Sequence, residues 1–153
     1  MGELLDENSE TRDGKPEAER AELIALAGKE TDGLVWIAND GPQYQAVECL
    51  ADETFYGGEA GGGKTDLLCG LSLTEHSRSL LLRRNNKEVS GMEDRICEIV
   101  GGRDYLNSTK HVLRYIEKTV EMGGCQWEGD KQKYKGNPHD LIGFDEISDF
   151  SET

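Results

Sequence analysis

Residues 56–68 read YGGEAGGGKTDLL, a stretch that combines five glycines with one lysine and one threonine and then continues into leucines. Glycine loses more conformational entropy on folding than any other residue, so a cluster of glycines indicates a special backbone geometry or a ligand. Residues 58–65 match the pattern G-x-x-x-x-G-K-[ST]. In that pattern the backbone amides surround phosphate oxygens, the lysine reaches the β- and γ-phosphates, and the hydroxyl binds Mg²⁺. The stretch therefore predicts a site for a nucleoside triphosphate.

The flanking residues predict that this loop connects a strand to a helix. ETFYGG (53–58) is typical of a buried strand, and KTDLLCGLSLTEH (64–76) is typical of a helix. A helix N-terminus has a positive dipole end, which favours bound phosphate. The residues expected to bind the nucleotide are those of the loop and the first turn of the helix: Gly58, Glu59, Ala60, Gly61, Gly62, Gly63, Lys64, Thr65 and Asp66.

A second motif, LIGFDEIS, occupies residues 141–148. Its mostly apolar beginning predicts a buried strand with Asp145 at the carboxyl end, which is where ligands bind in open α/β sheets. Asp145 is expected to hold Mg²⁺, and the adjacent Glu146 is the natural base to orient and deprotonate an attacking water. An acidic strand end alone is weak evidence for a site. It becomes strong when a phosphate-binding pattern lies about 80 residues upstream.

The remaining elements are predicted from apolar periodicity and from glycine and proline positions. Alternating strands and helices indicate a layered α/β domain with a mainly parallel sheet flanked by helices. Besides the segments above, the expected elements are a helix within 15–29 closed by Gly28, a helix beginning after Pro42, a strand over 78–84, a helix over 88–102, a strand from 111 leading into a hairpin turned at Gly123 and Gly124, and a strand within 139–150.

The composition of the 153-residue chain bounds its class: it is 31% charged and 35% hydrophobic, with a net charge of −14. That size fits about one domain. The charge argues against a surface that binds nucleic acid unaided, because such binding depends on Lys and Arg. The beginning of the chain lacks the basic and apolar regions of a signal peptide, so we expect a cytoplasmic protein without a membrane segment. The four cysteines lack the spacing of a zinc site.

The identity of the base depends on weaker signals. GTPases read guanine with N-K-x-D downstream of the acidic strand, whereas NPHD at 137–140 lacks the lysine and precedes that strand. A glutamine upstream of the loop, Gln43 or Gln45, could pair with the edge of adenine. We therefore expect ATP.

Three stretches together resemble a known family. They are DGPQYQAVECLADETFYGGEAGGGKTDLLCGL (40–71), RSLLLRRNN (78–86) and KYKGNPHDLIGFDEISDF (133–150). They resemble the ATPase domain of the large terminase subunit of tailed bacteriophages, the motor that packages DNA into an empty capsid. The resemblance covers roughly residues 34–152. It implies a P-loop NTPase fold with an additional strand between the two nucleotide motifs, and it implies ATP and Mg²⁺ as ligands.

The resemblance also implies roles for individual residues. Gln43 would contact adenine, Lys64 and Thr65 would serve phosphate and Mg²⁺, Asp145 the metal and Glu146 the water. Motors of this family also use an arginine soon after the second strand, in cis or as a finger into the neighbouring subunit. The candidates are Arg83, Arg84 and Arg95, and Arg84 is the one that we expect to be catalytic.

The partners implied by the resemblance are double-stranded DNA, the capsid portal and the small terminase subunit. The active form would be a ring of identical chains in the host cytoplasm, transiently at the portal.

Large terminase subunits continue into a coupling motif and a nuclease domain, whereas this chain ends seven residues beyond Glu146. We therefore expect an acidic lead-in with a short helix over 1–32 and an ATPase domain over 33–153 that is incomplete at its C-terminus, without nuclease activity. The alternatives are a helicase-like ATPase that depends on DNA or RNA, and a nucleotide-binding fragment without turnover.

Overall fold

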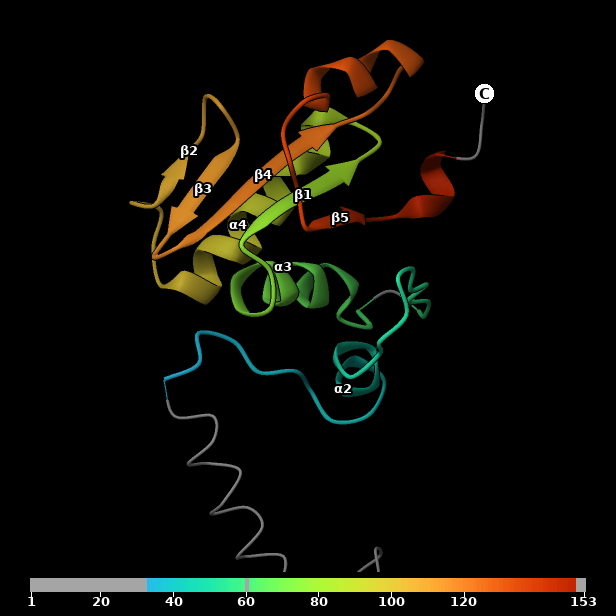
Figure 1. The fold of residues 1–153 in the computed structure, drawn as a ribbon, viewed down its shortest axis with the longest axis vertical. Helices are drawn as coiled ribbons and strands as arrows, with labels where there is room; N and C mark the ends of the chain where they lie inside the picture. The colour runs from blue at the N-terminus through green and yellow to red at the C-terminus, as the bar shows by residue number, and fades with distance from the viewer. Residues whose placement is uncertain (1–32, 60, 151–153) are drawn as a thin grey trace, which may run out of the picture. The chain divides into compact units, whose positions relative to one another are not determined.

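A five-stranded sheet forms the frame of the computed structural model, which describes residues 33–59 and 61–150 (Figure 1). The strand order is β2-β3-β4-β1-β5, and all described residues from Val35 onward belong to one compact unit. The strands are β1 (Arg78–Arg83), β2 (Leu106–Asn107), β3 (Val112–Tyr115), β4 (Lys118–Gly124) and β5 (Leu141–Phe144). The helix predicted within 15–29 lies outside the described residues.

The sheet is mixed, so the prediction of a mainly parallel sheet is confirmed only in part. β1 is parallel to β4 and to β5, whereas β2–β3 and β3–β4 are antiparallel. The antiparallel part arises because β3 and β4 form a hairpin that turns at Ile116 and Glu117, with Ile116 at φ 53°. Gly123 and Gly124, predicted as the turn, instead end β4. They lie in the strand because they pair with Leu82 and Arg83 of β1. Glycine is needed at both positions because a Cβ on Gly123 would collide with Tyr134, and one on Gly124 with Asn86.

Three α-helices and three short 3₁₀ segments accompany the sheet in the described part of the chain. The helices are α2 (Pro42–Val47), α3 (Lys64–Thr74) and α4 (Val89–Val100), and the short segments are η1 (Asn86–Glu88), η2 (Glu128–Tyr134) and η3 (Ile147–Phe150). α3 and α4 cover one face of the sheet (Figure 1). As predicted, α2 has its proline at the first turn and α4 is closed by left-handed Gly101. No helix among the described residues has the length and apolar character needed to span a membrane.

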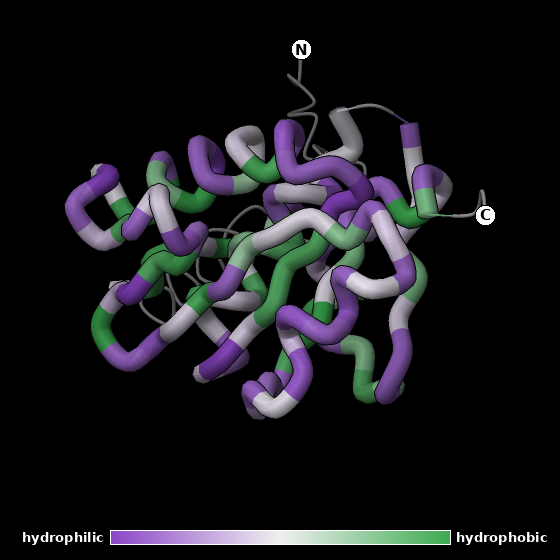
Figure 2. Tube along the Cα trace, turned by 90° about the horizontal axis from the view of Figure 1, so that it is seen from above, coloured by the Kyte–Doolittle hydropathy of each residue, from purple (hydrophilic) through white to green (hydrophobic). Residues whose placement is uncertain are grey.

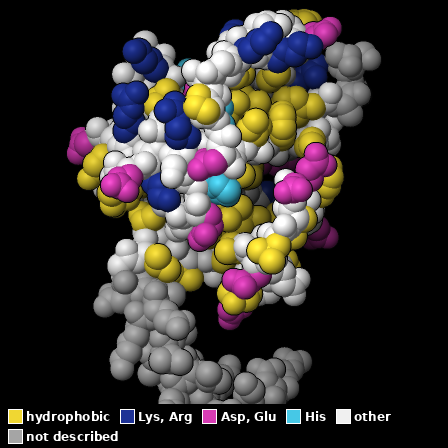
Figure 3. Space-filling view, viewed as in Figure 1, with side chains coloured by type: hydrophobic (Ala, Val, Ile, Leu, Met, Phe, Trp, Pro, Cys, Tyr) yellow, Lys and Arg dark blue, Asp and Glu magenta, His cyan; other side chains and the backbone are white. Residues whose placement is uncertain are grey.

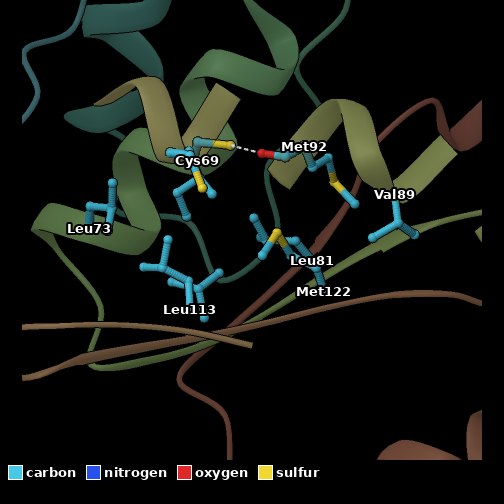
Figure 4. Packing of buried hydrophobic residues seen from close by; sticks show 10 residues of the cluster. Cys69, Leu73, Leu81, Val89, Met92, Leu113 and Met122 are labelled. Carbon is cyan, nitrogen blue, oxygen red and sulfur yellow. Dashed lines mark hydrogen bonds between the residues drawn. The ribbon is translucent and has the colours of Figure 1, made fainter. Parts of the chain in front are cut away.

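The hydrophobic core lies between the sheet and the helices α3 and α4. Figure 2 shows the apolar strands inside and the more polar helical surface outside. Figure 4 shows how side chains from both layers interlock, with the Cys69 thiol of α3 directed at the Met92 carbonyl oxygen of α4, 3.9 Å from Sγ. Burial raises the pKa of the Cys69 thiol to about 12. The fully buried members of the core include Cys69, Leu81, Met92, Ile96, Leu113 and Val120.

The strand predicted over 53–58 is absent: residues 54–58 have no regular secondary structure, and Phe55 is exposed. A strand is stabilised by a hydrogen-bonded neighbour, and within the described residues β5 pairs only with β1, which leaves its other edge unpaired. Ile142 and Phe144 of β5 are also exposed. Figure 3 shows hydrophobic side chains gathered on this side of the molecule, next to lysine and arginine side chains. Residues 53–58 therefore lead into the loop without joining the sheet.

Candidate active site

The candidate site lies where the carboxyl ends of β1 and β5 meet the N-terminus of α3. β1 and β5 are adjacent and parallel, and their pairing extends one residue past β5 because the Asp145 amide donates to the Leu82 carbonyl oxygen at 2.9 Å. The parallel arrangement places Arg83 and Asp145 at the same edge of the sheet. This is the edge at which open α/β sheets bind ligands.

The glycine-rich loop curls around the side chain of Lys64. Lys64 Nζ donates to the carbonyl oxygens of Gly58 at 3.2 Å and Glu59 at 3.3 Å. The Gly62 amide donates to the same Glu59 oxygen at 3.1 Å, and the Tyr56 hydroxyl donates to the Gly62 carbonyl oxygen at 3.1 Å. The ammonium group thus lies inside the curve of the loop, which is the position a cation needs in order to meet an anion bound there.

Gly63 marks the point at which the loop becomes a helix. It is the N-cap of α3 and has φ 72°, in the left-handed region that residues with a Cβ resist. A Cβ at this position would also collide with the Gln43 side-chain amide nitrogen. The third glycine of GGGK is therefore required both by backbone conformation and by the close approach of Gln43.

The two sequence motifs are joined by a direct hydrogen bond. Thr65 Oγ1 donates to Asp145 Oδ2 at 2.8 Å, although the two residues are 80 positions apart. Arg83 donates to the same oxygen through Nε at 2.9 Å and Nη2 at 2.6 Å. One carboxylate oxygen thereby receives three donors from α3 and β1, and it ties the phosphate-loop motif to the acidic motif.

The other oxygen of Asp145 has no hydrogen-bond partner. The Asp145 side chain is 1% exposed, and its Oδ1 atom is buried and unsatisfied. A buried carboxylate oxygen without a donor is costly and calls for a ligand. Carboxylate and hydroxyl oxygens are the ligands that Mg²⁺ prefers, and here Asp145 and Thr65 offer one of each. The donor set therefore fits Mg²⁺, although no group of three or more His, Cys, Asp and Glu residues that could hold a metal occurs in the described part.

Glu146 lies next to this buried pair but faces solvent. It follows β5 directly, is exposed and has φ 54°, a left-handed conformation that is uncommon for a residue other than glycine. Such backbone strain costs on the order of 1–3 kcal/mol and tends to occur at functional positions. The turn separates the two neighbouring carboxylates, so that Asp145 points into the protein while Glu146 remains accessible to water.

Gln43 is buried, and its side-chain amide is bonded at both ends. Nε2 donates to the Gly63 carbonyl oxygen at 2.9 Å and to Asp66 Oδ2 at 3.1 Å. Oε1 accepts from the Asn39 backbone amide at 2.8 Å and from Asn39 Nδ2 at 2.9 Å. Gln43 thus positions the end of the glycine-rich loop. Contact with adenine, which remains a sequence-based prediction, would have to share an amide group already used inside the protein.

Asp66 is the centre of a second polar network beside the loop. Its Oδ1 accepts from Arg95 Nε at 2.9 Å and Nη2 at 2.6 Å, and its Oδ2 accepts from Trp36 Nε1 at 3.2 Å as well as from Gln43. Burial alone would raise the pKa of Asp66, but the hydrogen bonds from Arg95, Gln43 and Trp36 outweigh it and lower the pKa. The Trp36 ring also packs on Gly70, where no Cβ would fit. Asp66 therefore holds the segment around Trp36 and Gln43 against α3.

The three candidate arginines have different positions. Arg83 bonds to Asp145, and Arg95 bonds to Asp66 and also to Glu98 Oε2, at 2.8 Å. Arg84 is half-buried and makes an interaction of its own. The structure thus brings Arg83, rather than Arg84, to Thr65 and Asp145. Of the loop residues expected to bind the nucleotide, Gly58 and Glu59 contact Lys64. Thr65 and Asp66 bond to Asp145 and Arg95 instead, and Ala60 is outside the described residues.

Sequence reasoning missed Trp36 and the pairing partners of Arg83 and Arg95. The apolar run of Leu80 to Leu82 followed by Arg83 could have indicated that Arg83 shares an edge with Asp145, but only if β1 and β5 were known to be neighbours. No family model matches this chain, and no curated protein or solved structure matches it either.

Proposed function

We propose that the chain binds ATP with Mg²⁺ and hydrolyses it, at a site formed by residues 58–66, Asp145 and Glu146. The observation that carries this proposal is the 2.8 Å hydrogen bond from Thr65 to Asp145, beside a buried and unsatisfied Asp145 oxygen. A hydroxyl that follows the lysine of a glycine-rich loop and an aspartate at a strand end are the metal-binding pair of P-loop ATPases. The α/β sheet with flanking helices is compatible with a P-loop NTPase fold, which is part of the proposal.

In this proposal each part of the site has a separate task. The amides of the glycine-rich loop and the N-terminus of α3 bind the phosphates, and Lys64 exchanges its carbonyl partners for phosphate oxygens. Thr65 and Asp145 hold Mg²⁺, directly or through water. The metal, when bound, neutralises negative charge on the β- and γ-phosphates. ATP rather than GTP is proposed because a glutamine upstream of the loop, Gln43 or Gln45, could pair with the edge of adenine.

Glu146 is proposed as the base for hydrolysis. Its exposed carboxylate would accept a proton from a water as the water oxygen bonds to the γ-phosphorus. The bond from the γ-phosphorus to the oxygen bridging to ADP breaks, and ADP and inorganic phosphate are released. The position of Glu146 directly after Asp145 supports this role, because it keeps a free carboxylate beside the metal-binding pair.

The biological role proposed is that of the ATPase domain of a phage DNA-packaging motor. This part of the proposal rests on the sequence resemblance to large terminase subunits. It includes the partners that the resemblance implies, namely double-stranded DNA, the portal, the small terminase subunit and further copies of the same chain in a ring.

Replacing Lys64 by alanine should weaken ATP binding by about 10- to 100-fold, because charge-assisted hydrogen bonds to phosphate contribute about 1.5–3 kcal/mol. Titration calorimetry of the parent and the variant with MgATP measures the loss. Lys87→Ala is the matched control, since Lys87 is an exposed lysine of η1 that lies outside the proposed site. Equal ATP affinity in the parent chain and in Lys64→Ala would refute the proposed site.

A further inference from the structure

Arg83 is bonded to both groups that the proposed function assigns to Mg²⁺. Its Nε and Nη2 donate to Asp145 Oδ2 at 2.9 and 2.6 Å, and its Nη2 lies 3.4 Å from Thr65 Oγ1. Thr65 donates to the same Asp145 oxygen. A positive charge that belongs to the protein therefore already lies against the hydroxyl and the carboxylate of the metal-binding pair.

The guanidinium is held in this position by the fold. Arg83 ends β1, which runs beside β5, and its Nη1 donates to the Glu88 carbonyl oxygen at 3.3 Å, just before α4. The Arg83 side chain is 19% exposed and that of its partner Asp145 only 1%. A carboxylate so deeply buried needs a compensating charge, and Arg83 supplies it.

The positive charge of Arg83 compensates the Asp145 carboxylate only at one of its two oxygens. All three donors bond to Oδ2, while Oδ1 is buried and unsatisfied. A cation bound at Asp145 could use Oδ1, but it would stand within a few ångströms of the guanidinium. Two like charges so close together in a partly buried site repel each other strongly. Arg83 and a divalent cation are therefore expected to exclude each other from the pair formed by Asp145 and Thr65.

We propose that Arg83 occupies the cation position of this site, and that a divalent cation binds there only when the guanidinium is displaced from Asp145. Naming the cation as the Mg²⁺ of an ATP site rests on the proposed function, but the competition itself does not. The consequence is an order of binding: the metal alone binds poorly. It binds well together with a polyphosphate, whose negative charge offsets both cations.

The competition is tested with Mn²⁺ alone, a spectroscopic substitute for Mg²⁺, in the absence of nucleotide. Free Mn²⁺ is measured by electron paramagnetic resonance during titration of the whole chain and its variants. Arg83→Gln retains a hydrogen-bond donor near Asp145 but removes the charge, and it should bind Mn²⁺ at least about 10-fold more tightly than the parent. Adding Asp145→Asn to Arg83→Gln should abolish that gain.

Arg95→Gln is the matched control, because it breaks a second arginine–aspartate pair, between Arg95 of α4 and Asp66 of α3, with an Nη2–Oδ1 distance of 2.6 Å. It should leave the Mn²⁺ affinity unchanged. If Arg83→Gln binds Mn²⁺ no more tightly than the parent, the proposed competition is wrong. ATP binding is a separate question. If Arg83→Gln binds Mn²⁺ more tightly but the parent does not bind ATP, the competition between Arg83 and the metal is upheld and the proposed function is rejected.

A measurement on the parent chain avoids dependence on a variant that could fail to fold. Nuclear magnetic resonance can follow the exchange of the Arg83 Nε proton with water, which the hydrogen bond to Asp145 slows. Saturating MgATP or Mg²⁺ should accelerate this exchange at least several-fold, while the Arg95 Nε proton, bonded to Asp66, remains protected. An Arg83 Nε proton that stays protected at saturating metal would overturn the proposal.

Discussion

Replacing Glu146 by glutamine is expected to reduce the rate of ATP hydrolysis by about 10²- to 10⁴-fold while ATP affinity remains close to that of the parent. Glutamine preserves the size of the side chain and its hydrogen bonding, but its amide cannot accept the proton of the attacking water. Glu146 is exposed and lies outside the contacts that join Thr65, Arg83 and Asp145, so its replacement should not disturb them. The loss should therefore be kinetic.

The experiment compares phosphate release and ATP affinity for Glu146→Gln and for Asp149→Asn, each at the concentration at which the parent turns over fastest. Asp149 is an exposed acid of η3, three residues beyond Glu146, and its replacement controls for the lost negative charge. Asp149→Asn should hydrolyse ATP at the parent rate. Parent-like turnover by Glu146→Gln would exclude Glu146 as the base and require another acceptor for the proton.

The second large effect expected is a dependence of turnover on protein concentration. Charge that builds up on the γ-phosphoryl oxygens needs a cation, and an arginine supplied by a neighbouring subunit can accelerate hydrolysis by about 10³- to 10⁵-fold. Within one chain, Arg95 is bonded to Asp66 and Glu98, and Arg83 to Asp145. The edge of β5 that has no partner strand among the described residues also favours association. We therefore expect slow hydrolysis in dilute solution and faster hydrolysis when chains assemble.

Phosphate release across a dilution series, with and without duplex DNA, measures this dependence. The specific rate should rise with protein concentration, and DNA alone should not stimulate it, because a chain of net charge −14 has little means of holding DNA at physiological salt. Fast turnover at every dilution would contradict assembly of the site from two copies. Strong stimulation by DNA would favour the helicase-like alternative.

The elements that sequence predicted correctly are those with a strong local signal. The apolar run in RSLLLR predicts β1, and Pro42 marks the beginning of α2. The apolar stripe of residues 89–100, followed by Gly101, predicts α4 and its end. The errors concern long-range pairing. Gly123 and Gly124 have the composition of a turn, but they lie in a strand that pairs with β1, where Tyr134 and Asn86 leave no room for a Cβ. The segment 53–58 has the composition of a strand, but no neighbouring strand pairs with it in the described structure.

The candidate site was predicted to the extent that it lies in contiguous motifs. Residues 58–65 and the pair Asp145 and Glu146 follow patterns that carry their chemistry in their spacing. The side chains that bond to those residues could not be predicted from the spacing of a motif. The contact between Arg83 and Asp145 depends on the order β1-β5, and the network around Asp66 depends on how Trp36 packs on Gly70. Such contacts are set by tertiary packing, which no single stretch of sequence encodes.

The central claim is that the glycine-rich loop and the end of β5 form one ATP site, and hydrogen–deuterium exchange with and without MgATP tests it most directly. The two segments are 80 residues apart in sequence at their closest contact, Thr65 to Asp145. The account predicts that MgATP slows exchange in peptides covering both 58–66 and 141–147, and that Lys64→Ala abolishes both effects together. Slower exchange in only one of the two segments, or in neither, would contradict it.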